Sequence, residues 1–538
     1  MKITPPTCKQ LIINCLEFLT KPFSADVQLS LFLFLCLIIP DIFSFLVFAD
    51  LVPYVVSAVD FLLCYIILIP AVLLPSNICK YYKMFLWFIG FLLLSCNIYV
   101  ISLYERSLNS LSVEMIAAIL ATNSAEVYEY FITYFKIDKL LYILCGILLF
   151  ILLFYRLSKV KMHLSLAPRI MLFLCVLFSV FVVADNAQKA RAVNIVKLLS
   201  AERTPDLREY RQTPIIVKDD STTENVVMII GESFSKSHSS IYGYGKNTNP
   251  LLGKIIPDSS LFVYDKVTSS HTGTIANIIA IMSSYISEKA DSIEWYKYLN
   301  IIDVMGNAGF KNYWISNQSK RGASDNEVGR YAELCDVEWF VGDKFSGMAR
   351  ENLDEELFPY IDSCLQEQIE KKFMIIHLMG SHPAYKKRYP QRFSKFKAED
   401  YALSHPHLPE ESRTMLSEYD NSVLYNDWVI NEVVRKFENT DAVVVYFSDH
   451  GQDVYDSSDN YAGHSKIGNL KSEEAGINIP FMVYTSPIFR EKHPELQQRI
   501  ESAVSRPYRT DSVMYTIMDI AGVETVNGVS YKHKSLFK

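Results

Sequence analysis

The chain has 538 residues, enough for more than one domain of roughly 100–200 residues each. Hydrophobic residues make up 50% of it and the formal net charge is -7, and we expect no nucleic-acid partner. The apolar residues are concentrated between about 27 and 186, whereas the remainder has the composition of a water-soluble domain. A chain that is soluble throughout is therefore excluded.

Five apolar stretches approach the length of about 20 residues that a membrane-crossing helix needs. They are Val27–Phe48, Leu51–Leu74, Met84–Tyr104, Leu140–Tyr155 and Arg169–Val183. The last two are short and need flanking residues to cross. The sequence thus predicts an N-terminal five-helix transmembrane domain, residues 27–186, behind an arm formed by residues 1–26.

Lysine and arginine residues next to the spans predict the direction in which the chain crosses, because such residues stay in the cytoplasm. The arm and the loops after the second and fourth spans lie on one side of the membrane. Their basic residues are Lys2, Lys9, Lys21, Lys80, Lys83, Arg156, Lys159 and Lys161. We expect this side to be cytoplasmic, which leaves everything after Asp185 outside. No small-residue cleavage pattern follows the basic start, so the first span is predicted to stay uncleaved.

Two segments on the outer side are interpreted as lying along the bilayer. Glu105–Lys139 contains apolar runs too short to span, which indicate either interfacial helices that guide a lipid or a simple connecting hairpin. Residues 187–223 are interpreted as an interfacial helix, mixed basic and apolar, and a linker rich in Pro, Arg and Asp. The outer domain is therefore expected to span residues 224–538.

The outer domain contains several short apolar runs typical of buried strands. Val226–Ile230 is unbroken and ends at Gly231, as expected for a strand covered on both faces of a parallel sheet. The others are Phe310–Ile315, Phe373–Leu378, Ala442–Phe447 and Ile479–Tyr484. These runs predict an α/β domain with a mainly parallel sheet and helices on both faces.

Polar side chains follow four of these strands directly. They are Glu232, Asn317, Gln318, His382, Asp449 and His450. In open α/β sheets the ligand crevice lies outside the carboxyl ends of the strands, and carboxylate and imidazole groups suit a metal such as zinc. A capping or surface role is the alternative for any one of these residues taken alone.

A turn rich in hydroxyl groups and glycine, Thr268–Thr274, precedes the apolar run Ile275–Met282 and predicts a helix that begins at the turn. A hydroxyl group at a helix N-terminus lies beside free N–H groups that can hold phosphate oxygens. Thr272 or Thr274 could equally do no more than cap the helix. Further along, residues 384–415 are rich in basic side chains, which indicates either a contact surface for an anionic acceptor or a solvated insertion.

Taken together, these motifs resemble those of the bacterial phosphoethanolamine transferases, which belong to the alkaline phosphatase/sulfatase superfamily. The motifs that carry the resemblance are Gly231–Ser233, Ser239–Tyr244, Asn247–Pro250, Ser270–Asn277, Trp314–Gln318, Gly380–Pro383, Tyr389–Pro390, Ser448–Gly451 and Gly463–His464. The five-span anchor is similar as well, so the resemblance covers nearly the whole chain. It implies an outer domain with the alkaline phosphatase/sulfatase fold.

The resemblance implies a zinc ion surrounded by Glu232, Thr274, Asp449 and His450, with Thr274 as the nucleophile. Zinc would lower the pKa of the hydroxyl and draw charge from the phosphoryl oxygens. Ser233 is given only a structural role. Because it follows Glu232 on an extended strand end, its side chain is expected to point the opposite way.

The resemblance also implies the surroundings of the phosphoryl group. His382 and His464 would line the substrate phosphate, help the leaving group or bind a second metal, and Asn317 and Gln318 would contact the phosphoryl group. The donor would be phosphatidylethanolamine and the acceptor lipopolysaccharide core, lipid A or a periplasmic glucan. The protein would then be a multi-pass protein of the bacterial inner membrane, in contact with membrane lipids, with its catalytic domain in the periplasm. We expect a monomer.

Several alternatives stay open at this level. Lipid A-modifying members carry cysteines beside the nucleophile turn where this chain has Ser270 and Ala280, which favours core sugars or glucans as acceptors. Phosphoglycerol transferases of the same superfamily have nearly the same catalytic residues, and a non-catalytic membrane receptor would keep the fold. In the outer domain, Cys335 and Cys364 either form one disulfide or remain two thiols.

Overall fold

The computed structural model describes residues 8–48, 54–104, 137–159, 164–185, 207, 217–219, 223–285, 295–320, 327–342, 353–459, 462–463 and 469–538. Most of the predicted interfacial segments, residues 105–136 and 186–200, lie outside the described residues, and so does His464. The chain forms two compact units. The first holds the helices up to Asp185 and the second the elements from Val217 onward, and each is described by itself.

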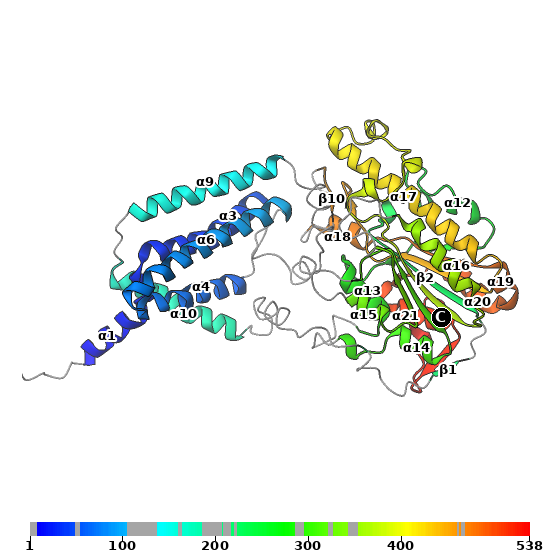
Figure 1. Ribbon diagram of the computed structural model, residues 1–538, viewed down its shortest axis with the longest axis horizontal. Helices are drawn as coiled ribbons and strands as arrows, with labels where there is room; N and C mark the ends of the chain where they lie inside the picture. Colours follow the sequence, from blue (N-terminus) through cyan, green and yellow to red (C-terminus); the bar gives the residue numbers. More distant parts are fainter. Residues whose placement is uncertain are drawn as a thin grey trace, which may run out of the picture. The chain divides into compact units, whose positions relative to one another are not determined.

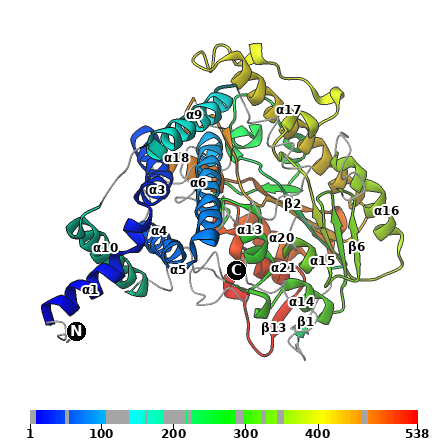
Figure 2. The same cartoon turned by 60° about the vertical axis from the view of Figure 1, so that its left-hand side comes forward.

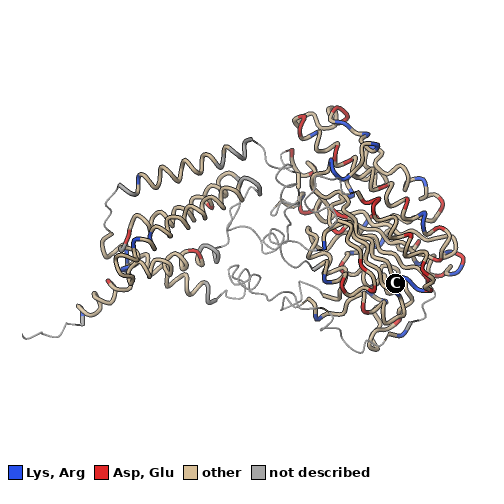
Figure 3. The backbone as a smooth tube through the Cα atoms, in the orientation of Figure 1, with Lys and Arg blue, Asp and Glu red and all other residues tan. Residues whose placement is uncertain are grey.

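The first unit consists of helices (Figure 1), and long stretches of them contain no charged residue (Figure 3). They are α1 (Cys8–Thr20), α2 (Pro22–Ala25), α3 (Val27–Phe48), α4 (Tyr54–Leu68), α5 (Pro70–Leu73), α6 (Ser76–Tyr104), α9 (Ile137–Lys159) and α10 (Leu166–Asp185). Among the described residues, two stretches are long and apolar enough to cross a membrane, Val27–Val47 and Ser76–Ile101. Three further apolar stretches are shorter: Ala58–Leu73, Leu144–Leu157 and Leu166–Val182. The apolar helices are confirmed, whereas the count of five spans stays a prediction.

Aromatic packing holds α3, α6 and α9 together. The ring of Phe32 stacks on Trp87 at 4.1 Å between centroids and meets the edge of Phe150 at 5.6 Å. Gly90 makes this possible, because a Cβ there would lie 2.3 Å from a ring carbon of Phe32. Small residues are common where transmembrane helices pack together, because they let the helices approach closely.

The second unit is built on a seven-stranded sheet with the order β3-β11-β8-β2-β7-β5-β6. These strands are β2 (Asn225–Gly231), β3 (Leu261–Val263), β5 (Lys311–Ser316), β6 (Val337–Phe340), β7 (Lys372–His377), β8 (Ala442–Ser448) and β11 (Phe481–Thr485). The five strands from β8 to β6 are parallel. The sheet is mixed, however, because β11 runs antiparallel to β8 and β3.

Three small strand pairs complete the second unit. They are β1 (Val217–Asp219) with β13 (Val523–Val526), β4 (Val267–Thr268) with β12 (Tyr508–Arg509), and β9 (Asp453–Val454) with β10 (Ala462–Gly463). Because β1 lies in the segment predicted as a linker, part of that segment belongs to this unit. Cys335 and Cys364 do not form a disulfide. Burial raises the pKa of the Cys364 thiol to about 12.

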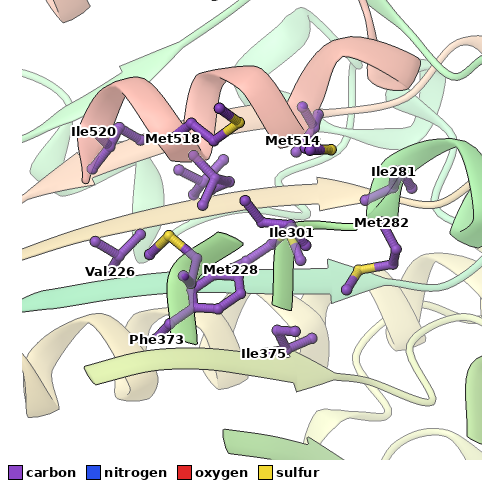
Figure 4. Close-up of a cluster of buried hydrophobic side chains, with 14 of the residues drawn as sticks. Val226, Met228, Ile281, Met282, Ile301, Phe373, Ile375, Met514, Met518 and Ile520 are labelled. Carbon is purple, nitrogen blue, oxygen red and sulfur yellow. The ribbon is translucent and has the colours of Figure 1, made fainter. Parts of the chain in front are cut away.

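Helices cover both faces of the sheet (Figures 1 and 2), which explains why its strands are apolar without alternation. Val226 and Met228 of β2 enter one core, shown in Figure 4 with Met514 and Met518, whereas Val227 enters the other. Helices that contribute buried residues to the first core are α13 (Thr274–Met282), α14 (Ile301–Asn307), α15 (Glu327–Ala332), α19 (Pro487–Lys492), α20 (Pro494–Ser502) and α21 (Val513–Ile520). Those of the second core are α12 (Leu252–Ile255), α16 (Phe358–Gln366) and α17 (Glu410–Lys436).

Candidate active site

Three buried ligand groups meet where β2 and β8 end. Glu232 follows β2, and Asp449 and His450 follow β8. The two strands are adjacent and parallel, with Gly231 paired to Ser448, so the residues after them lie side by side. One ligand atom from each of the three side chains lies within 4.8 Å of the others, and none of the residues is more than 1% exposed. The predicted convergence at this sheet edge is therefore present.

Hydrogen bonds orient each of these ligand groups. His450 Nδ1 lies 2.7 Å from the carbonyl oxygen of Gly451, which leaves Nε2 facing Glu232 Oε1 at 3.2 Å. A histidine that donates one ring N–H to a carbonyl presents its other nitrogen to a metal. Asp449 Oδ1 accepts hydrogen bonds from the backbone N–H groups of Ser233 at 3.3 Å and of His450 at 2.6 Å.

The expected orientation of Ser233 is wrong. Its hydroxyl donates a 2.6 Å hydrogen bond to Glu232 Oε1 instead of pointing the opposite way. The reason is backbone geometry: Ser233 has φ of 56°, so the chain leaves the extended conformation there and alternation ends. Ser233 thus contacts both carboxylates, Glu232 through its hydroxyl and Asp449 through its N–H.

The charges of the cluster are strongly coupled. Burial alone raises the pKa of Glu232, but the hydrogen bond and charge of His450 outweigh it and hold that pKa well below its usual range. Burial and the charge of Glu232 raise the pKa of Asp449 to about 7. Burial alone would lower the pKa of His450, yet the two carboxylates raise it to about 10. The cluster therefore attracts positive charge.

The donor set fits a zinc ion. Two carboxylates and an imidazole are groups that zinc binds, and no hydrogen bond from the described residues reaches the buried Asp449 Oδ2. This oxygen lies 3.7 Å from His450 Nε2. A dication would supply the charge that a single proton on His450 supplies only in part.

Thr274 lies at this cluster. It is the first residue of α13, and its Oγ1 is 3.3 Å from both Glu232 Oε2 and His450 Nε2. Gly273 holds the N-cap position, with no side-chain capping bond, so the alternative in which Thr274 only caps the helix has no support. The hydroxyl is placed beside the candidate metal ligands and at the positive end of a helix.

The turn before Thr274 is held by a residue to which the sequence reasoning gave no role. Asn277 Oδ1 accepts hydrogen bonds from Ser270 Oγ and from the His271 N–H, both at 2.9 Å. Asn277 Nδ2 donates to the carbonyls of His271 at 2.7 Å and Gly273 at 3.1 Å. Its place in the Ser270–Asn277 motif was the available signal.

The residues expected to contact the phosphoryl group are placed differently from one another. Gln318 Nε2 donates to Glu232 Oε2 and to the carbonyl of Leu378, both at 3.1 Å, so it lies against a metal-ligand candidate. Asn317 is fully buried and donates to Asp354 Oδ1 at 2.8 Å. His382 is half-buried on the loop after β7. His464 lies outside the described residues.

Solved structures share this architecture. The C-terminal periplasmic domain of EcEptC from Escherichia coli in complex with Zn is 28% identical with a TM-score of 0.55, covering 60% of this chain and 89% of that one. The integral membrane protein lipooligosaccharide phosphoethanolamine transferase A (EptA) from Neisseria meningitidis has a TM-score of 0.60 at 19% identity. It covers 90% of this chain and 91% of that one, and shows the shared fold.

Curated relatives match more than half of the chain. Phosphoethanolamine transferase EptC of Escherichia coli (strain K12) is 30% identical over 313 residues, 57% of this chain and 52% of that protein. Phosphoethanolamine transferase EptA of Helicobacter pylori is 29% identical over 316 residues, 57% of each chain. This chain spans about half the length of the curated relatives it matches. The sulfatase family model matches residues 224–523, and the chain therefore belongs to the sulfatase family.

Proposed function

We propose that this protein transfers phosphoethanolamine from phosphatidylethanolamine to an acceptor of the bacterial envelope. The observation that carries the proposal is the position of Thr274 Oγ1, 3.3 Å from Glu232 and from His450 at the positive end of α13. The named relatives are phosphoethanolamine transferases. A hydroxyl nucleophile beside a buried metal-ligand set is what such a transfer requires.

A zinc ion held by Glu232, Asp449, His450 and Thr274 would lower the pKa of the threonine hydroxyl and polarise the phosphoryl oxygens. In the first step, Thr274 Oγ1 loses its proton and forms a bond to phosphorus. The hydroxyl donates a hydrogen bond to Glu232 Oε2, which orients it, and its proton passes to solvent. The bond between phosphorus and the glycerol oxygen breaks, and diacylglycerol leaves with a proton for which we propose His382 as the donor.

In the second step, an acceptor oxygen attacks the phosphorus of the phosphoethanolamine–threonine ester, and we propose that the acceptor hydroxyl gives its proton to His382. Thr274 leaves as the alcohol, taking up the proton equivalent that it lost in the first step. We assign the surroundings of the phosphoryl group in both steps to His382 and His464, with Asn317 and Gln318 beside them. The acceptors that fit the proposal are lipopolysaccharide core, lipid A or a periplasmic glucan. The absence of the flanking cysteines, at Ser270 and Ala280, favours the core and the glucan.

The apolar helices serve the same proposal. We propose five spans in the bacterial inner membrane, with residues 224–538 in the periplasm and the protein acting as a monomer. Solved relatives include an integral membrane protein and isolated periplasmic domains. An anchor of this kind keeps a catalytic domain beside its lipid donor at high effective concentration.

The test is the covalent adduct. The full-length protein, loaded with zinc, is incubated with phosphatidylethanolamine vesicles, and the peptide containing Thr274 is weighed by mass spectrometry. We expect one added phosphoethanolamine in the wild type and in Thr272→Ala, a matched change in the same turn, and none in Thr274→Ala. An adduct on another residue, or unchanged transfer by Thr274→Ala, contradicts the mechanism.

A second set of vesicles tests phosphatidylglycerol as the rival donor lipid. With phosphatidylglycerol in place of phosphatidylethanolamine, we expect no adduct. A phosphoglycerol adduct on Thr274 would identify the phosphoglycerol transferase alternative. The acceptor is then found by comparing envelope lipids and glycans of cells with and without the protein.

A further inference from the structure

The loop that presents His382, residues 379–383, is held by two buried charged side chains outside the sheet. The first is Asp354, at the start of a short 3-10 helix and only 3% exposed. Its Oδ1 accepts a hydrogen bond from the Met379 N–H at 2.8 Å, and its Oδ2 accepts one from the Gly380 N–H at 3.0 Å. The same carboxylate accepts the bond from Asn317.

The second is Arg388, also 3% exposed. Its Nε donates to the carbonyl oxygen of His382 at 3.1 Å, and its Nη2 donates to that of Pro383 at 2.9 Å. Thus a carboxylate binds the N–H groups at the start of the loop, and a guanidinium binds the carbonyls at its end. Arg388 is therefore not part of a solvated basic surface, unlike the exposed Arg392 nearby.

The loop also rests on the backbone of Glu232. The Ser381 N–H donates to the Glu232 carbonyl at 2.9 Å. Gly380 has φ of 52°, and a Cβ there would lie 2.7 Å from the same carbonyl oxygen. A shift of the loop would therefore change the position of His382 relative to the metal-ligand candidate Glu232.

We propose that Asp354 and Arg388 are positioning residues that fix His382 and Asn317 against the phosphoryl group bound at Thr274. This inference rests on the proposed function. A buried charge is costly unless it is fully hydrogen-bonded, and here two such charges direct four of their hydrogen bonds to one five-residue loop. Strands are fixed by their ladders, whereas this loop has no ladder, and the two side chains supply the missing constraint.

The first experiment is a double-mutant cycle on adduct formation at Thr274 in phosphatidylethanolamine vesicles. Asp354→Asn keeps the size of the side chain but places an amide N–H₂ group where a carboxylate oxygen accepted a hydrogen bond. We expect it to slow adduct formation about ten- to hundredfold, as an unsatisfied buried N–H implies. In a His382→Ala background, the same change should slow it clearly less, because the part of the effect that acts through His382 is already lost and only the part through Asn317 remains.

Each test variant has a control at an exposed residue of the same type. For Asp354→Asn the control is Asp362→Asn, an acid of α16 that is 47% exposed and pairs with Lys436, and we expect wild-type rates. The second test variant, Arg388→Lys, keeps the charge but cannot make the same paired contact, and we expect a roughly tenfold loss of rate. Arg392→Lys, at an arginine 54% exposed that pairs with Glu355, should have no effect.

The second experiment does not depend on activity. Amide hydrogen exchange of Met379 and Gly380 is measured in the zinc-loaded full-length protein, with the amides of β2 as an internal reference. Asp354→Asn should speed exchange of both amides at least about tenfold, leave β2 unchanged and keep the zinc content of the wild type.

Each outcome decides the inference. Unchanged exchange at Met379 and Gly380 overturns it, and so do losses that multiply fully in the double variant, since both mean that Asp354 does not act through the loop. If the wild type forms no adduct, the proposed function fails, and the exchange measurement still decides whether Asp354 holds the loop.

Discussion

The two sides of the candidate site are built differently. The metal-ligand side, Glu232 with Asp449 and His450, consists of residues that directly follow two adjacent strands in register. His382, which we propose for the phosphoryl side, lies on a loop whose hydrogen bonds go to Asp354, to Arg388 and to the backbone of Glu232. A parallel sheet therefore positions the first set through its own ladder, whereas the loop of His382 needs dedicated buried side chains.

A second motif loop is also held by a buried acid, here through side chains and not through backbone N–H groups. His238 is 2% exposed, and its Nδ1 lies 2.7 Å from Asp420 Oδ1 of α17. Tyr244 and Tyr401 donate to the other oxygen of the same carboxylate. Asp420 thus fixes His238, which precedes the Ser239–Tyr244 motif, and Tyr244, which ends it. Around this sheet edge, loops are held by buried acids and strand ends are held by the sheet.

The largest effect is expected from a substitution on the metal-ligand side. Asp449→Ala removes a proposed carboxylate ligand and the acceptor of two backbone N–H groups, so we expect loss of zinc and of transfer. Elemental analysis of the purified full-length protein measures this. The matched control is Asp441→Asn, a buried acid just before the other end of β8, which should keep the metal. Equal zinc content in Asp449→Ala and the wild type would remove Asp449 from the ligand set.

Next comes the contact between the two sides, at Gly380. Gly380→Ala forces a methyl group against the Glu232 carbonyl in a backbone region that disfavours side chains, and we expect it to destabilise by roughly 2–3 kcal/mol. Gly309→Ala is the control, since φ there is 85° but nothing lies within 4 Å of the added Cβ, and it should cost about 1 kcal/mol. Thermal unfolding midpoints of the full-length proteins compare the two. Equal shifts would mean that the close approach at Gly380 is relaxed without cost.

A smaller effect should follow from Ser233→Ala, which tests whether Ser233 supports the metal-ligand side. Removing the hydroxyl deletes the 2.6 Å bond to Glu232, and changes in groups that orient ligands typically weaken metal binding about 10–100-fold. Chelator competition gives the affinity. Ser235→Ala should bind zinc as the wild type does, because among the described residues the Ser235 hydroxyl pairs with Ser237 alone, at 2.8 Å. If Ser233→Ala binds zinc with unchanged affinity, Ser233 has only the structural role expected from the sequence.

The smallest effect concerns pH and the second motif loop. Burial alone would lower the pKa of His238, but Asp456 and Asp420 raise it to about 10. Because this lies above the unfolded value of about 6.5, the stabilisation is complete below about pH 6.5 and is lost as the pH rises through 10.

Between pH 7 and 9, the wild type should therefore lose at least about 1 kcal/mol more stability than His238→Gln. Unfolding midpoints of both proteins at the two pH values measure the difference. The same pH dependence in both proteins would show that His238 is not charged in the folded state.

Much of the metal-ligand side could be predicted from the sequence. Apolar runs that end at Gly231 and Ser448 fix where β2 and β8 stop, and the next residue is then at the sheet edge wherever the strands are neighbours. The helix beginning at Thr274 followed from the turn and the apolar run behind it. The side-chain direction of Ser233 was predicted wrongly, because its positive φ depends on contacts with Asp449 and Glu232 that are distant in sequence or specific to this turn.

The sequence by itself determined the apolar helices, the buried strands and the polar residues that end them, because these follow from local periodicity and composition. Only the tertiary structure decided that β11 is antiparallel and that Asp354 and Arg388 hold the His382 loop. Asp354 reaches Gly380 from 26 residues away, and nothing in its neighbours specifies that contact. Long-range hydrogen bonds of buried charges are fixed only once the strands are paired and the helices packed, because only then is water removed and each charge must find its partners.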